Sequence, residues 1–286
     1  MVIPCWNGKK LLEKNLAAVL ALKADEVIVV DDASEDDSVA FIKEHHPQIK
    51  IVSHRENLGF AKSCNDGFVA SAGEIIILLN LDVLPSANLL NFVLPHFEDK
   101  QVFAVSFHEQ QWSWGKIVWK NGFIEHSAGE KTNHLHISGW ASGGSAAFNR
   151  EILLELKGFD LLYHPFYWED LDLGYRAWKR GYRIVWEPKA LVEHKHEVSI
   201  SSRYSKGYVK FISNRNQLLF IWKNISDGQL ILSHSLSLIA KCFAHPGYSK
   251  IVLAALIKLP LIIPRWWQEK TEQKVSDKQI FSSFSN

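Results

Sequence analysis

The fold of this chain is decided by residues 74–82, EIIILLNLD. A short, unbroken run of Ile and Leu followed by polar residues is typical of a strand buried on both faces of a parallel sheet. The chain before it alternates similar apolar strands with segments of helical periodicity. We expect strands at residues 1–4, 26–30, 49–53 and 74–79, and helices at residues 10–23, 34–46 and 60–70. This alternation predicts an α/β fold, with a mixed, mainly parallel, Rossmann-like sheet flanked by helices and joined by right-handed crossovers.

Polar side chains follow two of these strands. Asp31 and Asp32 come after the second strand, and Asn80 and Asp82 after the fourth. The carboxyl ends of parallel strands meet at one edge of a sheet, so we expect these groups to converge on a ligand site there. The sequence has neither GxxxxGK[ST] nor a GxGxxG after the first strand, so a phosphate at this acidic edge would need a bridging divalent cation. The alternatives are a helix cap at Asp31 and Asp32 and a plain turn at residues 80–82.

A second stretch, YHPFYWEDLDLGYRAWKRGYR at residues 163–183, gathers candidate catalytic groups. Glu169, Asp170 and Asp172 fall in the first turn of a predicted amphipathic helix, where the helix dipole favours negative charge. Gly181 is expected to end that helix. The aromatic residues in front should exclude water from the carboxylates and raise a pKa toward the range of a general base. The alternative is an acidic first turn on a solvated helix.

Helical geometry separates these three carboxylates. Glu169 and Asp172 lie three residues apart and share a face, whereas Asp170 points elsewhere. We expect Asp172 to cap the helix or to pair with Arg176 on the next turn.

Composition limits the classes of function. The 286 residues are 47% hydrophobic and 22% charged, enough for one large or two small domains. With 32 basic and 31 acidic residues the net charge is +1, so no overall field favours nucleic acid. The three scattered cysteines predict free thiols in a reducing compartment. The opening MVIPCWNG lacks the pattern of a secretory signal, so none is expected, and the natural N-terminus is expected at or near Met1.

Eight motifs stand in an order that resembles family 2 glycosyltransferases, which are inverting enzymes of the GT-A fold. They are IPCWNG (3–8), VIVVDDAS (27–34), ENLGFAKSCNDG (56–67), EIIILLNLDVLP (74–85), SGGSAAFNR (142–150), GFD (158–160), FYWEDLDLGYRAWKRGYRI (166–184) and EPKALVEHKHEVS (187–199). The resemblance covers residues 1–225 and is closest to a bacterial branch of rhamnosyl- and related sugar transferases. It implies a catalytic domain at residues 1–225 and a C-terminal helical extension at residues 226–286.

The resemblance also implies a reaction. A sugar would pass from a UDP- or dTDP-sugar to a hydroxyl of a growing cell-surface glycan or a lipid-linked acceptor, with Mg²⁺ or Mn²⁺ as cofactor. This would make the chain a metal-dependent hexosyltransferase of cell-envelope polysaccharide biosynthesis. The alternative is a catalytically inactive nucleotide-sugar-binding or scaffold protein of the same fold.

Site residues follow from the same motifs. Asp170 corresponds to the catalytic base, with Glu169 beside it, and Trp168 and Asp172 would lie on the acceptor side. Asp82 and His194 would hold the metal. Asn80 departs from the family's acidic residue, because an amide can ligate but brings no charge. The nucleotide sugar would contact Pro4, Asn7, Asp31, Asp32, Asn57, Asn80 and Gly144.

The rest of the chain is less specific. Trp112, Trp114 and Trp119 predict a β-ribbon near the acceptor, or ordinary edge-strand aromatics. Two later runs, residues 230–243 and 251–263, are strongly apolar, and Trp266 and Trp267 follow them. They predict peripheral contact with the inner face of the cell membrane by a cytoplasmic protein, or a helical hairpin packed on the core or on a second subunit of a homodimer. The tail from residue 271 is expected to be loose.

Overall fold

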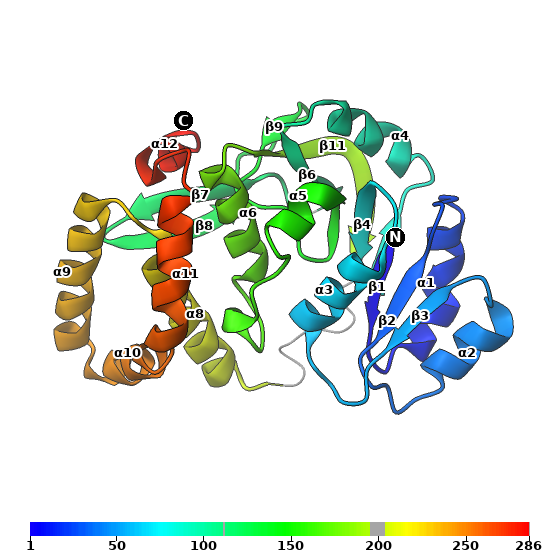
Figure 1. Ribbon diagram of the computed structural model, residues 1–286, viewed down its shortest axis with the longest axis horizontal. Coiled ribbons are helices and arrows are strands. Elements are labelled where there is room, and N and C mark those ends of the chain that lie inside the picture. The colour runs from blue at the N-terminus through cyan, green and yellow to red at the C-terminus, as the bar shows by residue number, and fades with distance from the viewer. Residues whose placement is uncertain (111, 195–203, 286) are drawn as a thin grey trace.

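The computed structural model describes residues 1–110, 112–194 and 204–285 (Figure 1). The first half follows the predicted alternation. Its elements are β1 (Val2–Cys5), α1 (Lys9–Leu20), β2 (Ile28–Asp31), α2 (Ser38–His45), β3 (Lys50–Ser53), α3 (Phe60–Ala70), β4 (Ile75–Leu79), β5 (Val83–Pro85), α4 (Leu89–Val93) and the 3-10 helix η1 (Leu94–Glu98).

The second half contributes further strands and then helices. Its elements are β6 (Val102–Glu109), β7 (Gly115–Lys120), β8 (Phe123–Ala128), β9 (His136–Ile137), β10 (Ser145–Asn149), α5 (Arg150–Glu155), η2 (Leu161–Tyr163), α6 (Glu169–Lys179), β11 (Arg183–His194), α8 (Lys206–Asn224), α9 (Gly228–Ala244), η3 (Pro246–Tyr248), α10 (Ser249–Leu256), α11 (Leu259–Thr271) and α12 (Asp277–Ser282).

The main sheet has the strand order β3-β2-β1-β4-β10-β6-β11-β5, with β9 beside β11, in the part of the chain described. β1 pairs in parallel with β2 and β4, and β2 with β3, as the sequence predicted. β10 runs antiparallel to both β4 and β6, which makes the sheet mixed. The predicted α/β class is therefore confirmed.

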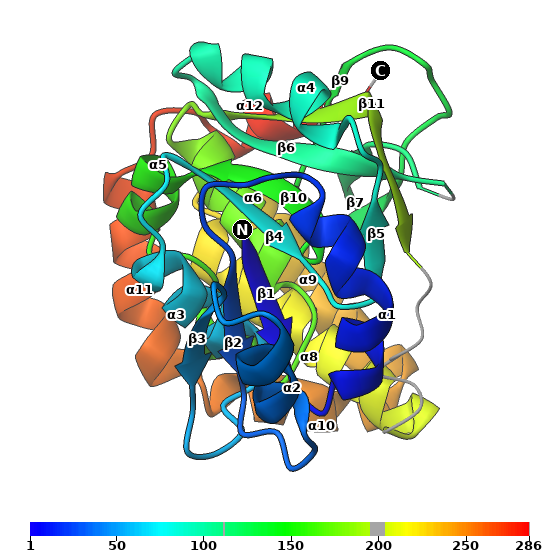
Figure 2. The same cartoon turned by 90° about the vertical axis from the view of Figure 1, so that its right-hand side faces the viewer.

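The sheet has a hydrophobic core on each face, and neighbouring residues of a strand pack into opposite cores because successive side chains point to opposite faces. Val2 and Val30 belong to a core that includes residues of α3, α5, α6 and α8. Ile3 and Val29 belong to the other, which α1, α2 and α4 cover. Both faces of the sheet are thus occupied by helices, and ligand access is left to the carboxyl ends of the strands (Figure 2).

β7 and β8 form the predicted ribbon as a separate hairpin. Asn121 and Gly122, the two turn residues, have φ angles of 50° and 75°, which a tight hairpin of type I′ requires. Trp114, just before the hairpin, is buried, whereas Trp112 is exposed. Trp119 lies on β7 and packs partly buried against the core.

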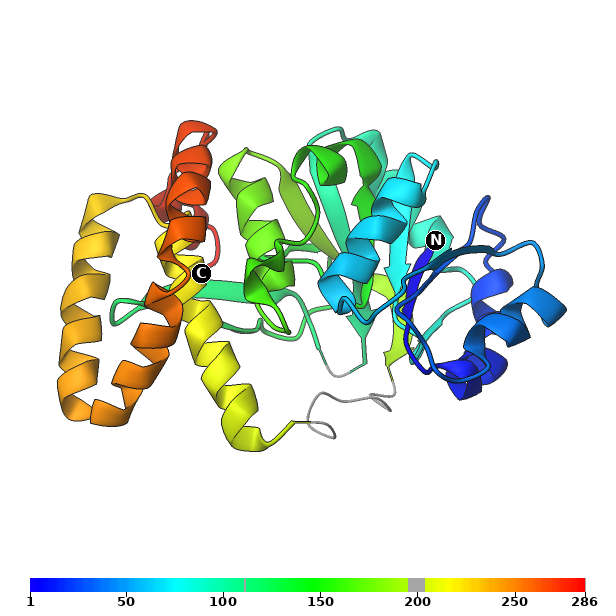
Figure 3. The ribbon, with the colours of Figure 1, turned by 60° about the horizontal axis from the view of Figure 1, so that its bottom comes forward.

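The C-terminal helices belong to the same core as the sheet. Ile225, Tyr248, Ile262 and Phe281 join one buried cluster with Trp186 of β11. The expectation of a loose tail from residue 271 is wrong, because α12 begins with a capping box and Phe284 is buried. The helices nevertheless lie together at one end of the molecule, away from α1 and α2 (Figure 3).

The apolar run at residues 251–263 is divided between α10 and α11. Among the described helices, none alone has the length and apolar composition to cross a membrane. Pro246–Leu256 and Leu259–Thr271 meet that test only as a pair, with a bend of 71° between them.

Candidate active site

The carboxyl end of β2 places two buried carboxylates at the edge of the sheet. Asp32 accepts hydrogen bonds from the backbone N–H groups of Leu58 and Gly59, both at 2.8 Å, and its Oδ1 lies 2.7 Å from His54 Nδ1. Asp32 therefore fixes the loop that leads into α3. Asp31 Oδ1 is buried and has no hydrogen-bond partner among the described residues. A buried acceptor without a partner costs free energy unless a ligand satisfies it.

The loop between β1 and α1 is tied to the loop after β2. Asn7, with a φ of 50°, accepts a hydrogen bond from the Glu35 backbone N–H through its side chain at 2.8 Å. Asn57 donates to the Asp32 carbonyl oxygen at 3.3 Å, and Pro4 lies half-buried within β1. These predicted nucleotide-binding residues thus line one rim, and the side chains of Asn7 and Asn57 hold the loops there in position.

Asn80 and Gly144 are in direct contact. The Asn80 backbone N–H donates to the Gly144 carbonyl at 2.9 Å. A Cβ atom added to Gly144 would lie 2.3 Å from Asn80 Nδ2, so a larger residue would force the Asn80 side chain to move. On the other side, a Cβ added to Gly143 would lie 3.5 Å from Asp170 Cβ. Two adjacent glycines therefore connect the end of β4 to the start of α6.

His194, at the end of β11, lies between two carboxylates. Its Nε2 is 3.2 Å from Asp82 Oδ1, and its Nδ1 is 3.1 Å from Glu109 Oε2. Glu109 also accepts hydrogen bonds from the hydroxyl groups of Ser145 at 2.6 Å and Ser142 at 3.1 Å. The predicted metal-binding pair is therefore together in space, and Glu109 orients it.

The electrostatics of this group follow from its burial and its contacts. Burial disfavours the charged imidazole, but the hydrogen bonds that its ring N–H groups donate to Asp82 and Glu109 outweigh burial and raise the pKa of His194 to about 9. Burial likewise opposes the charge of Glu109, but the hydrogen bonds from His194 and Ser145 lower its pKa below the usual value. Without a cation, this group holds a protonated histidine.

A divalent cation fits these residues only in part. Across residues 1–110, 112–194 and 204–285, no cluster of three or more His, Cys, Asp or Glu side chains is arranged to hold a metal ion. Asp82 and His194 offer one carboxylate oxygen and one imidazole nitrogen, and a cation would replace the proton that they share. Such an ion would need oxygen ligands from elsewhere, as phosphate oxygens supply in many nucleotide sites.

The segment before α6 has an unusual backbone conformation. Tyr167 and Trp168 have φ angles of 70° and 81°, which are uncommon outside glycine. Asn216 of α8 holds this segment, because its side-chain amide donates to the carbonyl oxygens of Tyr163, Phe166 and Tyr167 at 2.7–2.9 Å. α8 thereby fixes the position at which α6 begins.

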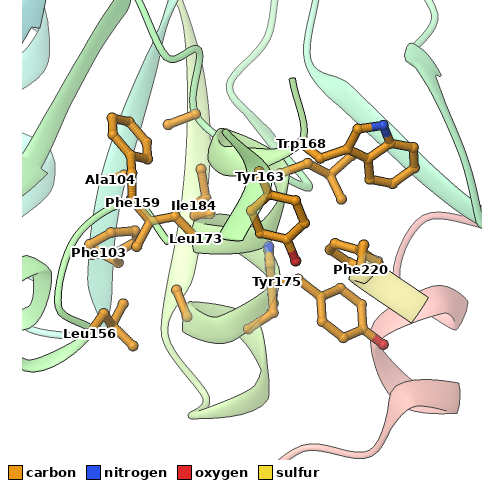
Figure 4. Close-up of a cluster of buried hydrophobic side chains, with 14 of the residues drawn as sticks. Phe103, Ala104, Leu156, Phe159, Tyr163, Trp168, Leu173, Tyr175, Ile184 and Phe220 are labelled. Atoms are coloured by element: carbon orange, nitrogen blue, oxygen red, sulfur yellow. The ribbon is translucent and has the colours of Figure 1, made fainter. Parts of the chain in front are cut away.

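Trp168 is buried beside Phe220 of α8, with ring centroids 5.4 Å apart (Figure 4). His126 of β8 contacts the other side of Trp168, with centroids 5.1 Å apart and rings nearly perpendicular. The hairpin therefore lies beside the α6 carboxylates.

Glu169 and Asp170 begin α6 as predicted. Both side chains are half-buried, and the inaccessible Oε2 of Glu169 has no hydrogen-bond partner among the described residues. Burial, and then the charge of Asp170, raise the pKa of Glu169. Burial also raises the pKa of Asp170, although the Leu171 backbone N–H at 2.8 Å and the nearby His126 oppose that rise. A raised pKa suits a group that exchanges protons near neutral pH.

Asp172 does not face the acceptor side, where it was expected, but lies in the core between α6 and α8. It is fully buried and accepts a hydrogen bond from Arg176 Nε at 2.7 Å, so the predicted pairing with Arg176 is confirmed. Tyr163, Lys223 and Asn224 also donate to it, at 2.6–2.8 Å. Burial opposes its charge, but Lys223 and Arg176 outweigh burial and hold the pKa of Asp172 far below the usual value. Its position differs from the expectation because α8 brings a second cation that the sequence did not reveal.

Three residues of this site were not predicted from the sequence: Glu109, His126 and Asn216. Glu109 ends β6 at the same edge of the sheet as Asp31 and Asp82, so its place after an apolar strand could have indicated it. Asn216 gave no such signal, because its sequence neighbours Ser213, Asn214, Arg215 and Gln217 are polar as well. His126 had no such signal, because its place depends on how the hairpin packs.

The family model of "Glycosyl transferase family 2" matches residues 1–156 of this chain. Among curated proteins, the chain is 25% identical over 201 residues to poly-beta-1,6-N-acetyl-D-glucosamine synthase of Staphylococcus aureus (strain COL), covering 66% of this chain and 48% of that protein. The chain spans about half the length of the curated relatives it matches.

Two solved structures share the fold. GalNAc-T7 with UDP, GalNAc and Mn²⁺ aligns with a TM-score of 0.63 at 16% identity, over 79% of this chain and 48% of that one. The mannosyltransferase PcManGT from Pyrobaculum calidifontis, in complex with GDP-Man and Mn²⁺, aligns with a TM-score of 0.56 at 17% identity, over 99% of this chain and 84% of that one. The predicted GT-A fold is confirmed.

Proposed function

Because this chain belongs to glycosyl transferase family 2, we propose that it is a glycosyltransferase that moves a sugar from a nucleotide-diphosphate donor to a hydroxyl group, with inversion. The donor is a UDP- or dTDP-sugar, as in the rhamnosyltransferase-like branch that the motifs resemble. The acceptor is a growing cell-surface glycan or a lipid-linked sugar at the cytoplasmic face of the cell membrane.

One observation carries the proposal: Gly143 and Gly144 join the two halves of the site. The Asn80 backbone N–H donates to the Gly144 carbonyl at the edge of the sheet, and the Gly143 backbone N–H faces the Asp170 carboxylate at the start of α6 and opposes the rise of its pKa. A sugar bound by its diphosphate at that edge would therefore have the half-buried carboxylate of Asp170 close to its reactive carbon. Inverting transfer needs such a base on the face opposite the leaving group.

We assign the proton transfer to Asp170. Its pKa is raised by burial, which brings its affinity for a proton closer to that needed at neutral pH. Glu169, next to it, has a pKa raised both by burial and by the charge of Asp170, so the pair holds a proton more readily than either group would in water. Trp168 and His126 would form the apolar wall against which the acceptor sugar packs.

Asp82 and His194 would hold Mg²⁺ or Mn²⁺ together with oxygens of the donor diphosphate. The cation would neutralise the charge of the leaving diphosphate. The Mn²⁺ bound with UDP in GalNAc-T7 and with GDP-Man in PcManGT supports this assignment. Asp31, whose Oδ1 has no partner among the described residues, would accept a hydrogen bond from the nucleoside.

The test is a donor-hydrolysis screen of the full chain with UDP-, dTDP- and GDP-sugars, each with Mn²⁺, with Mg²⁺ and with chelator. Hydrolysis of one donor that depends on a cation and releases a sugar of inverted anomeric configuration is the expected result. Tight binding of a donor without hydrolysis or transfer would favour the alternative, a nucleotide-sugar-binding protein of the same fold.

A further inference from the structure

The outward side of α9 carries an exposed apolar stripe. Its residues recur every three or four positions, which aligns them on one side of a helix. They are Leu232, Leu236, Ile239 and Phe243. The opposite side of α9 carries His234, whose Nδ1 donates to the Gly122 carbonyl oxygen at 2.8 Å, and this bond attaches the helix to the β7–β8 hairpin. The stripe therefore faces away from the protein.

A second exposed apolar group adjoins the end of that stripe. It consists of Leu253, Leu256 and Ile257 at α10, and Leu261 at the start of α11. The short helix η3 contacts both α9 and α10 and joins the two groups, while α10 and α11 pack their inner sides on α8. We call the two groups together the C-terminal apolar surface. Phe243 and Ile257 are 83% and 77% exposed, much more than large apolar residues usually are.

Lysines carry the net positive charge around this surface, because Arg265 is paired with Asp160 at 3.0 Å. From Gly228 to Lys270 the cationic residues are Lys241, Lys250, Lys258, Arg265 and Lys270, and Glu269 is the acidic one. Glu269 is buried in an ion pair with Arg180 at 2.7 Å, so its charge is neutralised within the protein. Lys250 is exposed and Lys258 is half-buried, and both lie within the apolar segments.

We propose that the C-terminal apolar surface docks on an anionic lipid bilayer. Apolar side chains surrounded by lysines match the acyl region and the charged headgroups of such a bilayer. The neighbouring Trp266 and Trp267 belong to the residue type enriched at membrane interfaces. A second copy of this chain fits less well, because a two-fold contact would bring the same lysines against each other.

Docking through the α10 part of this surface would bring the site near the bilayer. In Figures 1 and 2, α10 and the start of α8 lie at the lower end of the molecule. The arrow of β11, which ends at His194, points to that same end in Figure 2. The delivery of a lipid-linked acceptor to the site rests on the proposed function. The docking on a bilayer does not depend on that function.

The experiment is flotation of the full chain with vesicles of phosphatidylcholine, with and without phosphatidylglycerol, at increasing NaCl. The chain should float with the anionic vesicles, and less so as salt rises. Phe243→Ser combined with Ile257→Ser should lower the bound fraction at least about tenfold, because the double variant lacks two apolar side chains that would insert into the acyl region. Lys250→Glu and Lys258→Glu should each lower it about fivefold or more.

Matched controls are Val69→Ser, an exposed apolar residue of α3, and Lys43→Glu on α2, neither of which should change flotation. Thermal unfolding of each variant checks that it folds, and Leu253→Ser serves as a second apolar variant. Absence of flotation, or equal flotation of all variants, would overturn the proposal. The proposal would also be overturned if the unaltered chain did not bind vesicles and light scattering showed that Phe243→Ser converts a dimer to a monomer. No donor or acceptor enters this test, so its failure is separate from failure of the transfer reaction.

Discussion

Asp170 and Glu169 are adjacent in the chain but are expected to respond differently to loss of charge. Asp170→Asn keeps the size of the side chain and removes the proton acceptor. We expect turnover to fall at least about 100-fold while donor affinity is unchanged, the usual effect of losing a general base. Glu169→Gln should reduce turnover less. Transfer kinetics and donor titration measure both, and near-native transfer by Asp170→Asn would move the assignment to Glu169.

Glu169 should also make stability depend on pH. Its folded-state pKa is raised by burial and by Asp170, so the folded protein keeps a proton that the unfolded chain releases. The free energy of unfolding should therefore decrease as pH rises from about 5 to about 8. Glu169→Gln should remove that decrease and be more stable by over about 1 kcal/mol at the upper end. Thermal unfolding measured across this pH range tests the prediction, with Glu44→Gln at an exposed position as the control. The same dependence of stability on pH in Glu169→Gln and in the unaltered chain would contradict it.

Asp82 is the residue through which metal dependence should act. Asp82→Ala removes the carboxylate that pairs with His194 at 3.2 Å. We expect donor affinity in the presence of Mn²⁺ to fall at least about tenfold, the scale of losing a charge-assisted ligand, and to lose its dependence on the metal. Calorimetry with and without Mn²⁺ is the measurement. The exposed Asp99→Ala is the control, and an unchanged metal-dependent affinity in Asp82→Ala would exclude this role.

At the scale of elements, α6 and α8 are joined by a buried ionic network. Lys223 of α8 lies 2.8 Å from both Asp160 and Asp172, and Arg176 completes the charge balance on α6. Removing one partner from a buried network leaves an unpaired charge. The network therefore holds the helix that carries the carboxylates against the helix that fixes its start.

Lys223→Met should consequently destabilise the fold by about 3–5 kcal/mol. Lys210→Met, on the exposed side of the same helix, should change stability by less than about 0.5 kcal/mol. Denaturant unfolding of both variants compares them. Equal stability of the two would show that Asp172 finds its neutralisation elsewhere.

The elements of the first half could be predicted well from the sequence. EIIILL predicts β4 to within one residue, because a short unbroken apolar run indicates a strand that is buried on both faces. Both ends of α6 were also predicted from local signals: the three carboxylates mark its start, and Gly181, with a φ of 83°, follows its end. The division of residues 251–263 into α10 and α11 also has a local signal, because Lys258 and Pro260 interrupt the apolar run there and Pro260 lies in the first turn of α11.

For the whole molecule, the C-terminal helices complete the catalytic core. Lys179 of α6 is fully buried and lies 3.7 Å from Asp277 of α12. Tyr175 donates to the same carboxylate at 2.8 Å, and Phe281 covers its ring at 5.8 Å. The boundary predicted at residues 225 and 226 thus separates two stretches of sequence that share one core.

A chain that ends after Asp227 should therefore fail to fold. It would leave Lys179 buried without its carboxylate and would expose the apolar face of α8 that α10 and α11 cover. We expect aggregation, or a loss of cooperative thermal unfolding, in contrast to the full chain. A soluble monomer with the native circular dichroism and a sharp unfolding transition would contradict this prediction.

The sequence by itself determined the local features of this protein. It fixed the strand–helix alternation, the polar residues at the strand ends, the acidic first turn of α6 and the pairing of Asp172 with Arg176 four residues later. Each of these features depends on periodicity or on neighbours within about one turn, so it can be predicted from a short stretch of sequence.

Tertiary structure alone decided which of these groups remain open to a ligand. Asp172 is neutralised by Lys223, 51 residues away, and His194 is held by Glu109, 85 residues away. Glu169 and Asp170 lie in the same acidic turn but are half-buried, and their pKa values are raised. Among the residues described, no ion pair from α8 neutralises them as Lys223 neutralises Asp172. Adjacent carboxylates thus acquire different chemistry through distant partners, whose approach depends on how the helices pack and not on the local pattern.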